Sequence, residues 1–252
     1  MGLNEDIQNG NTVSQLKDLG YSASDLKNYQ GHSYTHEDLW EQLGDDIDGE
    51  SNNEWSGKVS LSDDGTIVAI GSGGYNTNAG RVRVFQRNVD NTTVAPIGWT
   101  QLGSDIVGES TNFWFGFMGV VSLSGDGTIV ACGAPGMDFG RGLVRVYQYN
   151  GTDWTQMGSD ITGSGEDNQF GHSVALSGDG TRLVVGAPET PNSSGGDWCG
   201  FVAGYQYNGT EWTQLGSNIT WNTAGDYHGH SVDMSTDGTT IAMGAPCPFT
   251  TY

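Results

Sequence analysis

The feature that most constrains the fold is a block of sequence that occurs four times. Each copy has an apolar anchor residue, then an Asp-Gly-Thr turn, then a glycine, always at the same spacing. The anchors are Leu61, Leu123, Leu176 and Met234, and the turns are residues 64–66, 126–128, 179–181 and 237–239. The glycines are Gly71, Gly133, Gly186 and Gly244. Such a repeat is typical of a protein that stacks copies of one supersecondary unit.

Each unit contains four short segments separated by turn residues, and each segment has the pattern of a strand. The segment after the Asp-Gly turn is a continuous apolar run, which predicts a strand covered on both faces. The third segment alternates apolar and polar residues, as in 82–86 and 144–148. The fourth begins with a tryptophan, at Trp40, Trp99, Trp154 and Trp212. The repeated glycines are predicted to occupy a crowded inner site where backbones approach closely.

Composition agrees with an all-β fold, because the chain has 41 glycines, 10% aromatic residues and only 15% charged residues. Four antiparallel strands with two apolar faces form a blade of a β-propeller. The prediction is a propeller over 40–252 with three full blades and two partial ones, repeating near 48–106, 107–161, 162–219 and 220–252. This count favours an incomplete larger ring, and a closed four-bladed ring is the alternative. Residues 1–39 differ, and the capping spacing of Ser22 and Asp25 predicts a short helical cap there.

The residue preceding each anchor strand is Trp55, Phe117, Phe170 or His228. With Phe170-Gly171 and Gly186-Ala187-Pro188 as the fullest match, residues 40–246 resemble FG-GAP repeats. These form the propellers of integrin α-subunits and of many secreted algal and bacterial proteins. The resemblance implies a non-enzymatic interaction or structural module, extracellular or at a cell surface, that binds a protein or glycan partner through its loops. A scaffold subunit of a larger assembly is the first alternative.

Many blades of this family carry a calcium loop, and here only its Asp-Gly remains, at Asp64, Asp126, Asp179 and Asp237. Calcium requires several carboxylate ligands. These aspartates are therefore expected to form hairpin turns, and no cofactor is predicted.

The net charge of −21 repels phosphate backbones and anionic headgroups, so nucleic acid is not an expected partner. The acidity is compatible either with solubility or with cation binding. No stretch has the length of about 20 apolar residues that a membrane span requires, so membrane insertion is not expected.

Histidines carry the second alternative, a glycan-active or metal-dependent enzyme with a site in the central channel. His172 and His230 occupy the same repeat position, and with His228 they would form a metal site if the blades bring them together. The other reading is repeated geometry without a ligand.

Long connections are the places where a partner is expected to bind. Three stand out, at 87–98, 108–117 and 189–200. The second contains Phe113, Trp114 and Phe115, which are either contact residues for a partner or side chains wedged between blades.

Five N-glycosylation sequons favour secretion, although Asn-Gly-Thr is also a hairpin turn. They lie at Asn91, Asn150, Asn192, Asn208 and Asn218. The three cysteines, Cys132, Cys199 and Cys247, have no metal-site spacing.

Overall fold

The computed structural model describes residues 42–109, 115, 120–191, 198–220 and 225–246. The chain divides into two compact units, residues 1–45 and residues 46–252. Of the first unit only 42–45 are described, so the expected N-terminal helical cap lies outside the described residues. The repeats lie in the second unit.

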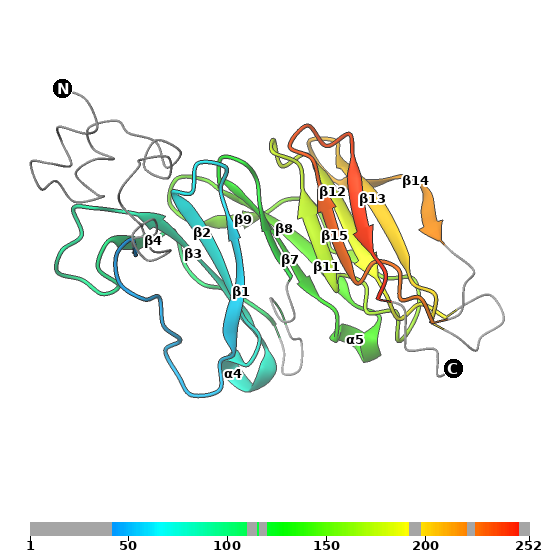
Figure 1. Ribbon diagram of the computed structural model, residues 1–252, viewed down its shortest axis with the longest axis horizontal. Helices are drawn as coiled ribbons and strands as arrows, with labels where there is room; N and C mark the ends of the chain where they lie inside the picture. Colours follow the sequence, from blue (N-terminus) through cyan, green and yellow to red (C-terminus); the bar gives the residue numbers. More distant parts are fainter. Residues whose placement is uncertain (1–41, 110–114, 116–119, 192–197, 221–224, 247–252) are drawn as a thin grey trace, which may run out of the picture. The chain divides into compact units, whose positions relative to one another are not determined.

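The second unit consists of antiparallel sheets, one for each copy of the repeat (Figure 1). Sheet 1 contains β1 (Ser56–Leu61), β2 (Ile67–Ser72), β3 (Arg81–Arg87), β4 (Trp99–Gln101) and β5 (Ile106–Val107). Sheet 2 contains β6 (Val121–Leu123), β7 (Ile129–Ala134), β8 (Leu143–Tyr149), β9 (Trp154–Gln156) and β10 (Ile161–Thr162). Sheet 3 contains β11 (Ser173–Leu176), β12 (Arg182–Ala187), β13 (Phe201–Tyr207) and β14 (Trp212–Thr220), and sheet 4 contains β15 (Ser231–Met234) and β16 (Ile241–Gly244). The predicted strand order, from the anchor strand to the tryptophan strand, is confirmed in sheets 1 to 3.

The tryptophan strand differs in detail from the prediction. In sheets 1 and 2 it is divided into two short strands that both pair with the third strand. Gly103 and Gly158 lie at the breaks with φ values of 68° and 72°. In sheet 3 the strand β14 continues through a register shift between Val202 and Gly204 of its partner.

The apolar runs form the middle strands, as the sequence predicted. Every residue of β2 and β7 is buried, and β12 is buried after Arg182. Two of the four repeated glycines are crowded by backbone as expected: a methyl group on Gly133 would lie 2.2 Å from the carbonyl oxygen of Gly171, and one on Gly186 would lie 2.0 Å from that of Gly229, whereas one on Gly244 would meet the side chain of Ser231.

The four Asp-Gly segments form hairpin turns of one design. Asp64, Asp126, Asp179 and Asp237 each accept hydrogen bonds from the preceding serine hydroxyl and from the following threonine N–H and hydroxyl. In the last copy, the hydrogen bonds from Ser235 and Thr239 hold the pKa of Asp237 at about 2. These carboxylates therefore stabilise the turns through local hydrogen bonds.

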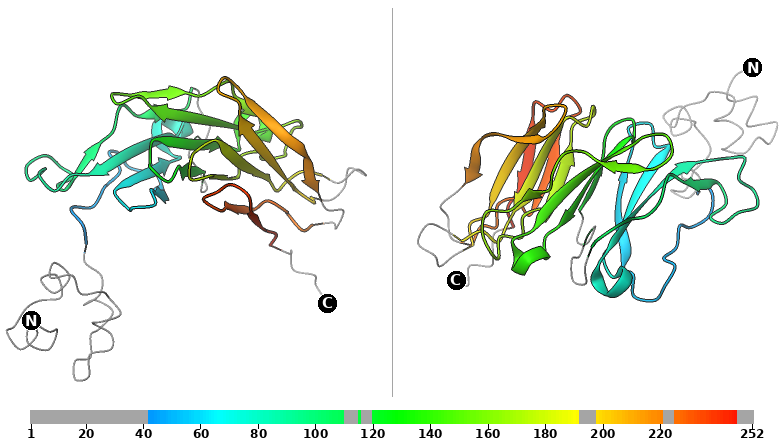
Figure 2. Two further views of the ribbon diagram at one scale, coloured as in Figure 1. Left: turned by 90° about the horizontal axis from the view of Figure 1, so that it is seen from above. Right: turned by 180° about the vertical axis from the view of Figure 1, so that it is seen from behind.

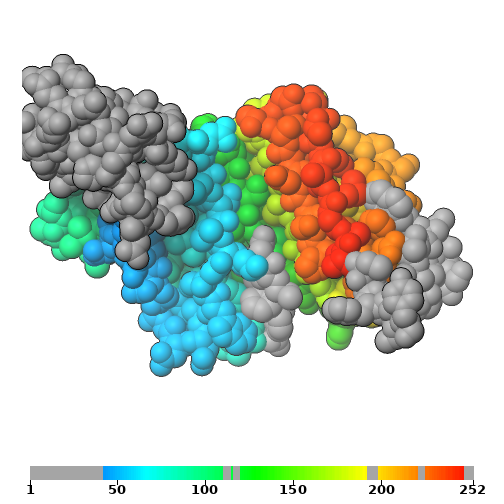
Figure 3. All heavy atoms as spheres, in the orientation of Figure 1, coloured from blue at the N-terminus to red at the C-terminus, as the bar shows by residue number. Residues whose placement is uncertain are grey.

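Consecutive sheets pack face to face, and the anchor strands β1, β6, β11 and β15 lie beside one another (Figure 2). The hydroxyl of Ser60 accepts a hydrogen bond from Leu123 N at 2.9 Å, and that of Ser122 accepts one from Leu176 N at 3.0 Å. Sheets packed in this way through their innermost strands are blades, so the fold is an all-β fold of the β-propeller type. In Figure 3 the repeats occupy successive coloured strips of the surface.

The contacts between blades correct the assignment of the aromatic residue that precedes the anchor strand of the second repeat. A glycine before the third strand forms a parallel bridge with the next repeat, in the pairs Gly80–Phe115, Gly142–Phe170 and Gly200–His228. Spacing from the anchor Leu123 assigned Phe117 to this position, and that assignment is wrong. Phe115 is the counterpart of Phe170, because it forms the bridge to the preceding repeat and the second copy has more residues between this position and its anchor.

Two short helical turns, α4 (Tyr75–Asn78) and α5 (Met137–Gly140), connect the second and third strands of sheets 1 and 2. Both include residues with positive φ, Asn76 and Thr77 in α4 and Asp138 and Phe139 in α5. None of the helices in the described part of the chain is long and apolar enough to span a membrane.

Candidate functional site

The aromatic loop predicted to contact a partner is partly inside the protein. Phe115 is completely buried in the core between sheets 1 and 2, where its ring meets Tyr147 edge-on at a centroid distance of 6.3 Å. The alternative prediction, a side chain wedged between blades, therefore holds for Phe115. Phe113 and Trp114 lie outside the described residues.

Two of the three histidines proposed for a metal site lie together. The rings of His172 and His230 are 4.7 Å apart, and Nδ1–H of His172 donates to the backbone oxygen of His230 at 3.2 Å. His228 instead faces Asp226, with 3.4 Å between Nε2 and Oδ2. Within the described ranges, no three His, Cys, Asp or Glu side chains gather in a way that could hold a metal ion.

The histidine pair predicts a pH dependence of stability. Burial, and then the neighbouring His230, hold the pKa of His172 below its usual value. The unfolded chain therefore takes up a proton before the folded chain does, so stability is complete above the usual histidine pKa and is lost as the pH falls through it. Thermal unfolding between pH 7.5 and 5.5 is expected to show this loss, by at most about 1.4 kcal/mol per pH unit. The variant His172→Asn should have the shallower dependence, and an unchanged slope would contradict the assignment.

The long connection between β3 and β4 folds around the side chain of Asn91. Its Nδ2 donates to the carbonyl oxygens of Val94, Pro96 and Trp99, at 2.8, 3.2 and 2.6 Å. Its Oδ1 accepts a hydrogen bond from Val94 N at 3.1 Å. One amide thus holds a loop that has no regular secondary structure.

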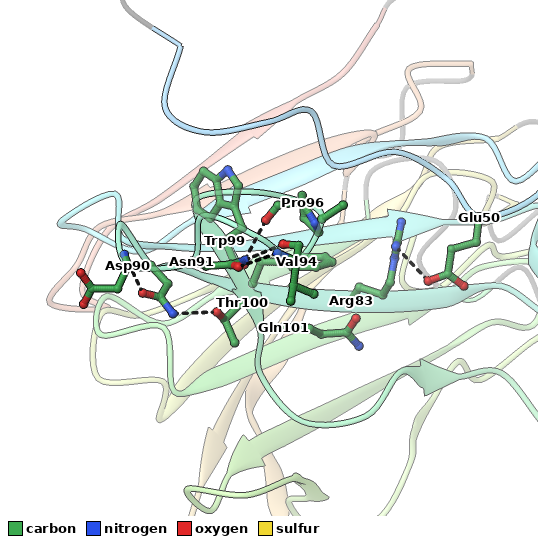
Figure 4. Close-up of a pocket in the computed structure, with 12 residues that line it drawn as sticks. Glu50, Arg83, Asp90, Asn91, Val94, Pro96, Trp99, Thr100 and Gln101 are labelled. Atoms are coloured by element: carbon green, nitrogen blue, oxygen red, sulfur yellow. Dashed lines mark hydrogen bonds and ion pairs between the residues drawn. The ribbon is translucent and has the colours of Figure 1, made fainter.

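This loop covers one side of a pocket of about 500 Å³ (Figure 4). The apolar part of its lining consists of Phe85, Val94, Ala95, Pro96 and Trp99. The polar part consists of Glu50, Arg83, Asn88, Asp90, Asn91, Thr100 and Gln101. The volume and the mixture of apolar surface with a few polar groups are those of a small-molecule site. We therefore take the pocket as the candidate functional site, and the sequence signal for it was the length of the 87–98 connection.

Glu50, which lines the pocket, also belongs to a charge network around the buried Arg81. Arg81, only 1% exposed, donates to Glu50 at 2.9 Å, to Asp105 at 2.6 Å and to both carboxylate oxygens of Glu54 at 3.1 and 3.0 Å. Its guanidinium also lies 4.3 Å from the centre of the Tyr75 ring. Burial alone would raise the pKa of Glu54, but hydrogen bonds from Ser51 and Arg81 keep it below its usual value. The sequence analysis missed this network, although two arginines in a strand of buried residues were a signal.

The sequons differ in how the fold uses their amides. In the hairpin turns, Asn150 and Asn208 are exposed and use Oδ1 as the acceptor of backbone N–H groups. Asn218 is exposed too, and its Oδ1 accepts from Gln214 at 2.6 Å. A glycan on Asn91 would disrupt the bonds that its Nδ2 makes within the loop. Asn192 lies outside the described residues, and glycosylation of the others stays a prediction.

Cys132 and Cys199 are both buried, and Cys132 is a free thiol. Burial raises the pKa of the Cys132 thiol, so it has the character of a core residue and not of a nucleophile. Cys247 lies outside the described residues.

No family model and no curated protein match the chain. Among solved structures it is similar to TolB from Acinetobacter baumannii (TM-score 0.43, 14% identity, 75% of this chain and 37% of that one). It is also similar to hydrazine synthase from Kuenenia stuttgartiensis (TM-score 0.44, 14% identity, 77% and 42%). A third is the β-propeller domain of the Trilobed protease from Pyrococcus furiosus, described as having an open velcro topology (TM-score 0.37, 10% identity, 66% and 42%). The chain spans about two fifths of the length of these proteins, and similarities at this level carry no functional information.

Proposed function

We propose that this chain is a non-enzymatic binding module of FG-GAP type that acts outside the cell and holds a glycan in the pocket beneath the 87–98 loop. The observation that carries the proposal is the lining of that pocket. Trp99 brings an aromatic ring to the cavity, while Asn88, Thr100 and Gln101 bring amide and hydroxyl groups. A sugar presents apolar C–H faces and hydroxyl groups side by side, so it matches this combination.

The size of the site favours a glycan over a protein partner. Stable protein–protein interfaces use surfaces of several hundred Å² per partner, whereas this site is a concave cavity of about 500 Å³. Glycan binding also agrees with the sequons, which favour secretion into a compartment where glycans are available.

Binding is favoured over hydrolysis by the state of the pocket's carboxylates. Glycoside hydrolysis requires two carboxyl groups that are available to exchange protons or attack the sugar. Glu50 already accepts a hydrogen bond from Arg81 at 2.9 Å and a longer one from Arg83 at 3.4 Å, and the closer bond with Arg81 occupies its carboxylate. Asp90 is the other carboxylate in the lining.

Two valines of the loop provide a matched test. Val94 lines the pocket and Val89 does not, yet they are 68% and 69% exposed. Val94→Trp is expected to fill part of the cavity and weaken glycan binding by about tenfold or more, because the added indole takes the space of the ligand. Binding is measured on an array of neutral and acidic glycans and then by calorimetry.

Val89→Trp is the control, since it adds the same side chain to the same loop outside the pocket. Equal binding by Val94→Trp and the unmodified protein would reject the pocket as the site. Release of sugar products during incubation would reject the non-enzymatic assignment.

A role as a subunit of a larger assembly is favoured by the outer face of sheet 1. Trp55, Val59 and Leu61 are exposed there, whereas the equivalent residues of sheet 2, such as Val121 and Leu123, are buried against the preceding sheet. An apolar face of this kind is suited to packing against another sheet.

A further inference from the structure

The repeat allows two arginines to be compared in one structural position. Arg83 lies in β3 opposite Ile70, and Arg145 lies in β8 opposite Cys132. Both side chains are buried, with exposed fractions of 4% and 8%. Differences between their partners therefore reflect differences between the two blades and not the position itself.

Arg145 is fully supplied with acceptors. Its Nε and Nη2 donate to the two oxygens of Asp160 at 2.7 and 2.8 Å, and its Nη1 lies 3.0 Å from Glu109. This is the bidentate geometry in which arginine binds carboxylates most strongly. The pair with Asp160 raises the pKa of Arg145 above its usual value.

Arg83 has lost the equivalent carboxylate. Asp105, which corresponds to Asp160 in the repeat, is bound to Arg81 at 2.6 Å and to Gln101 at 2.7 Å. Arg83 keeps a short bond to the backbone oxygen of Asp48, at 2.7 Å, and a distant contact with Glu50 at 3.4 Å.

The charge of Arg83 is therefore poorly compensated. Its Nε is buried and has no hydrogen-bond partner. Burial, and then the charge of Arg81, lower the pKa of Arg83, which is the opposite of the shift at Arg145. The carboxylate partner of Arg83, Glu50, is 3.4 Å away and 63% exposed, and a buried charge that is paired so weakly is costly.

The same blade has an extended hairpin loop. In sheet 2 the equivalent connection is a tight turn in which Asn150 accepts bonds from Thr152 N and Asp153 N. In sheet 1 the chain instead runs to Gly98 before returning, and it encloses the pocket that Arg83 lines. Figure 4 shows Arg83 and Glu50 at one end of this pocket and Trp99 and Pro96 toward the other.

We infer that Arg83 determines the specificity of the pocket and that the ligand is a sugar carrying a carboxylate, a uronate unit of an acidic glycan. This inference rests on the proposed glycan-binding function. The ligand's carboxylate would accept hydrogen bonds from Arg83 and balance its charge, as Asp160 does for Arg145. Glu50 can yield its place, because its side chain is 63% exposed and keeps its closer contact with Arg81.

The aromatic lining of the pocket and the net charge of the chain restrict the kind of glycan further. Trp99 lines the same pocket and is placed to cover the sugar ring while the carboxylate meets Arg83. A net charge of −21 repels densely sulfated chains over long distances, but it opposes a single buried carboxylate much less. The pocket is thus suited to isolated or terminal uronates.

The test uses two probes that differ only at one carbon, methyl α-D-galacturonide and methyl α-D-galactoside, with the glucuronide and glucoside as a second pair. The protein is expected to bind the acidic member of a pair about tenfold more tightly or better, which is the range of a hydrogen bond to a charged group. Arg83→Gln should abolish that preference, because it removes the charge that the ligand's carboxylate would meet. Arg83→Lys should keep part of it.

Arg145→Gln is the matched control, since it removes the equivalent charge from sheet 2 and should preserve the preference in protein shown to be folded by its thermal melt. Equal affinity for both members of each pair, or a preference that survives in Arg83→Gln, would overturn the inference. If neutral sugars bind, and Val94→Trp blocks them, the proposed function stands without the inference. If no sugar binds, both fail. Tighter binding of a short peptide ending in glutamate would also reject the glycan as ligand.

Discussion

Replacing Arg81 with methionine is expected to lower the free energy of unfolding by about 3–5 kcal/mol, the usual result of removing one partner from a buried ion pair. Glu54 is the reason. Its side chain is only 2% exposed, and Arg81 supplies both of its carboxylate oxygens with hydrogen bonds. Without the guanidinium, a buried charge would remain with the hydroxyl of Ser51 and the N–H of Glu50 as its donors. Denaturant unfolding measures the loss.

The pair Arg141–Asp138 provides the control, because it is partly exposed on both sides and its N–O distance is a similar 3.0 Å. Arg141→Met is expected to cost no more than about 1 kcal/mol. The double variant of Arg81 and Glu54 to methionine should recover part of the loss, since it leaves no buried charge unpaired. Equal losses for Arg81→Met and Arg141→Met would show that the network does not stabilise the fold.

The fold could be predicted because the repeat imposes the same local chemistry several times. The apolar run that became β12 is covered on both faces, and the Asp179 turn closes the hairpin before it. Strand periodicity and turn residues act over a few positions, so one sequence suffices to recognise them. Four copies in register then make stacking the way to bury both faces of each sheet.

The site could be predicted only as a loop. The length of the 87–98 connection was visible in the sequence, but the pocket also requires Glu50 and Arg83, which come from distant positions. The switch of Asp105 from Arg83 to Arg81 depends on tertiary contacts that no local pattern encodes. A comparison of copies gives the missing signal, because Arg81 stands where sheets 2 and 3 have Leu143 and Phe201.

The Phe117 misassignment has a similar cause. Spacing from Leu123 is a reliable guide only while the connection keeps its length, and the second copy has a longer one. The bridge from Gly80 identifies Phe115 by contact and not by counting. The feature that these repeats share is therefore a phenylalanine or histidine that pairs with a glycine of the preceding blade.

The bridge between Gly142 and Phe170 predicts that Gly142→Ala strongly destabilises the fold. A methyl group on Gly142 would lie 2.1 Å from the carbonyl oxygen of Phe170, and the residue has a φ of +75°. The clash is with backbone, so the bridge between blades would have to open. The positive φ costs about 1–2 kcal/mol for an L-residue, and overpacking adds about 1–3 kcal/mol. The expected loss of unfolding free energy is about 3 kcal/mol or more, measured by denaturant unfolding.

Gly151→Ala separates the two contributions. Gly151 has a φ of +94°, and a methyl group there would meet nothing within 4 Å. Its variant should therefore lose only the conformational part, about 1–2 kcal/mol. If Gly142→Ala loses no more than this, close approach between blades does not require a glycine. A methyl group added to Gly80 or Gly200 would also lie 2.1 Å from a carbonyl oxygen of the next repeat. A larger loss in Gly142→Ala would therefore mean that glycine is required at all three of these contacts between blades.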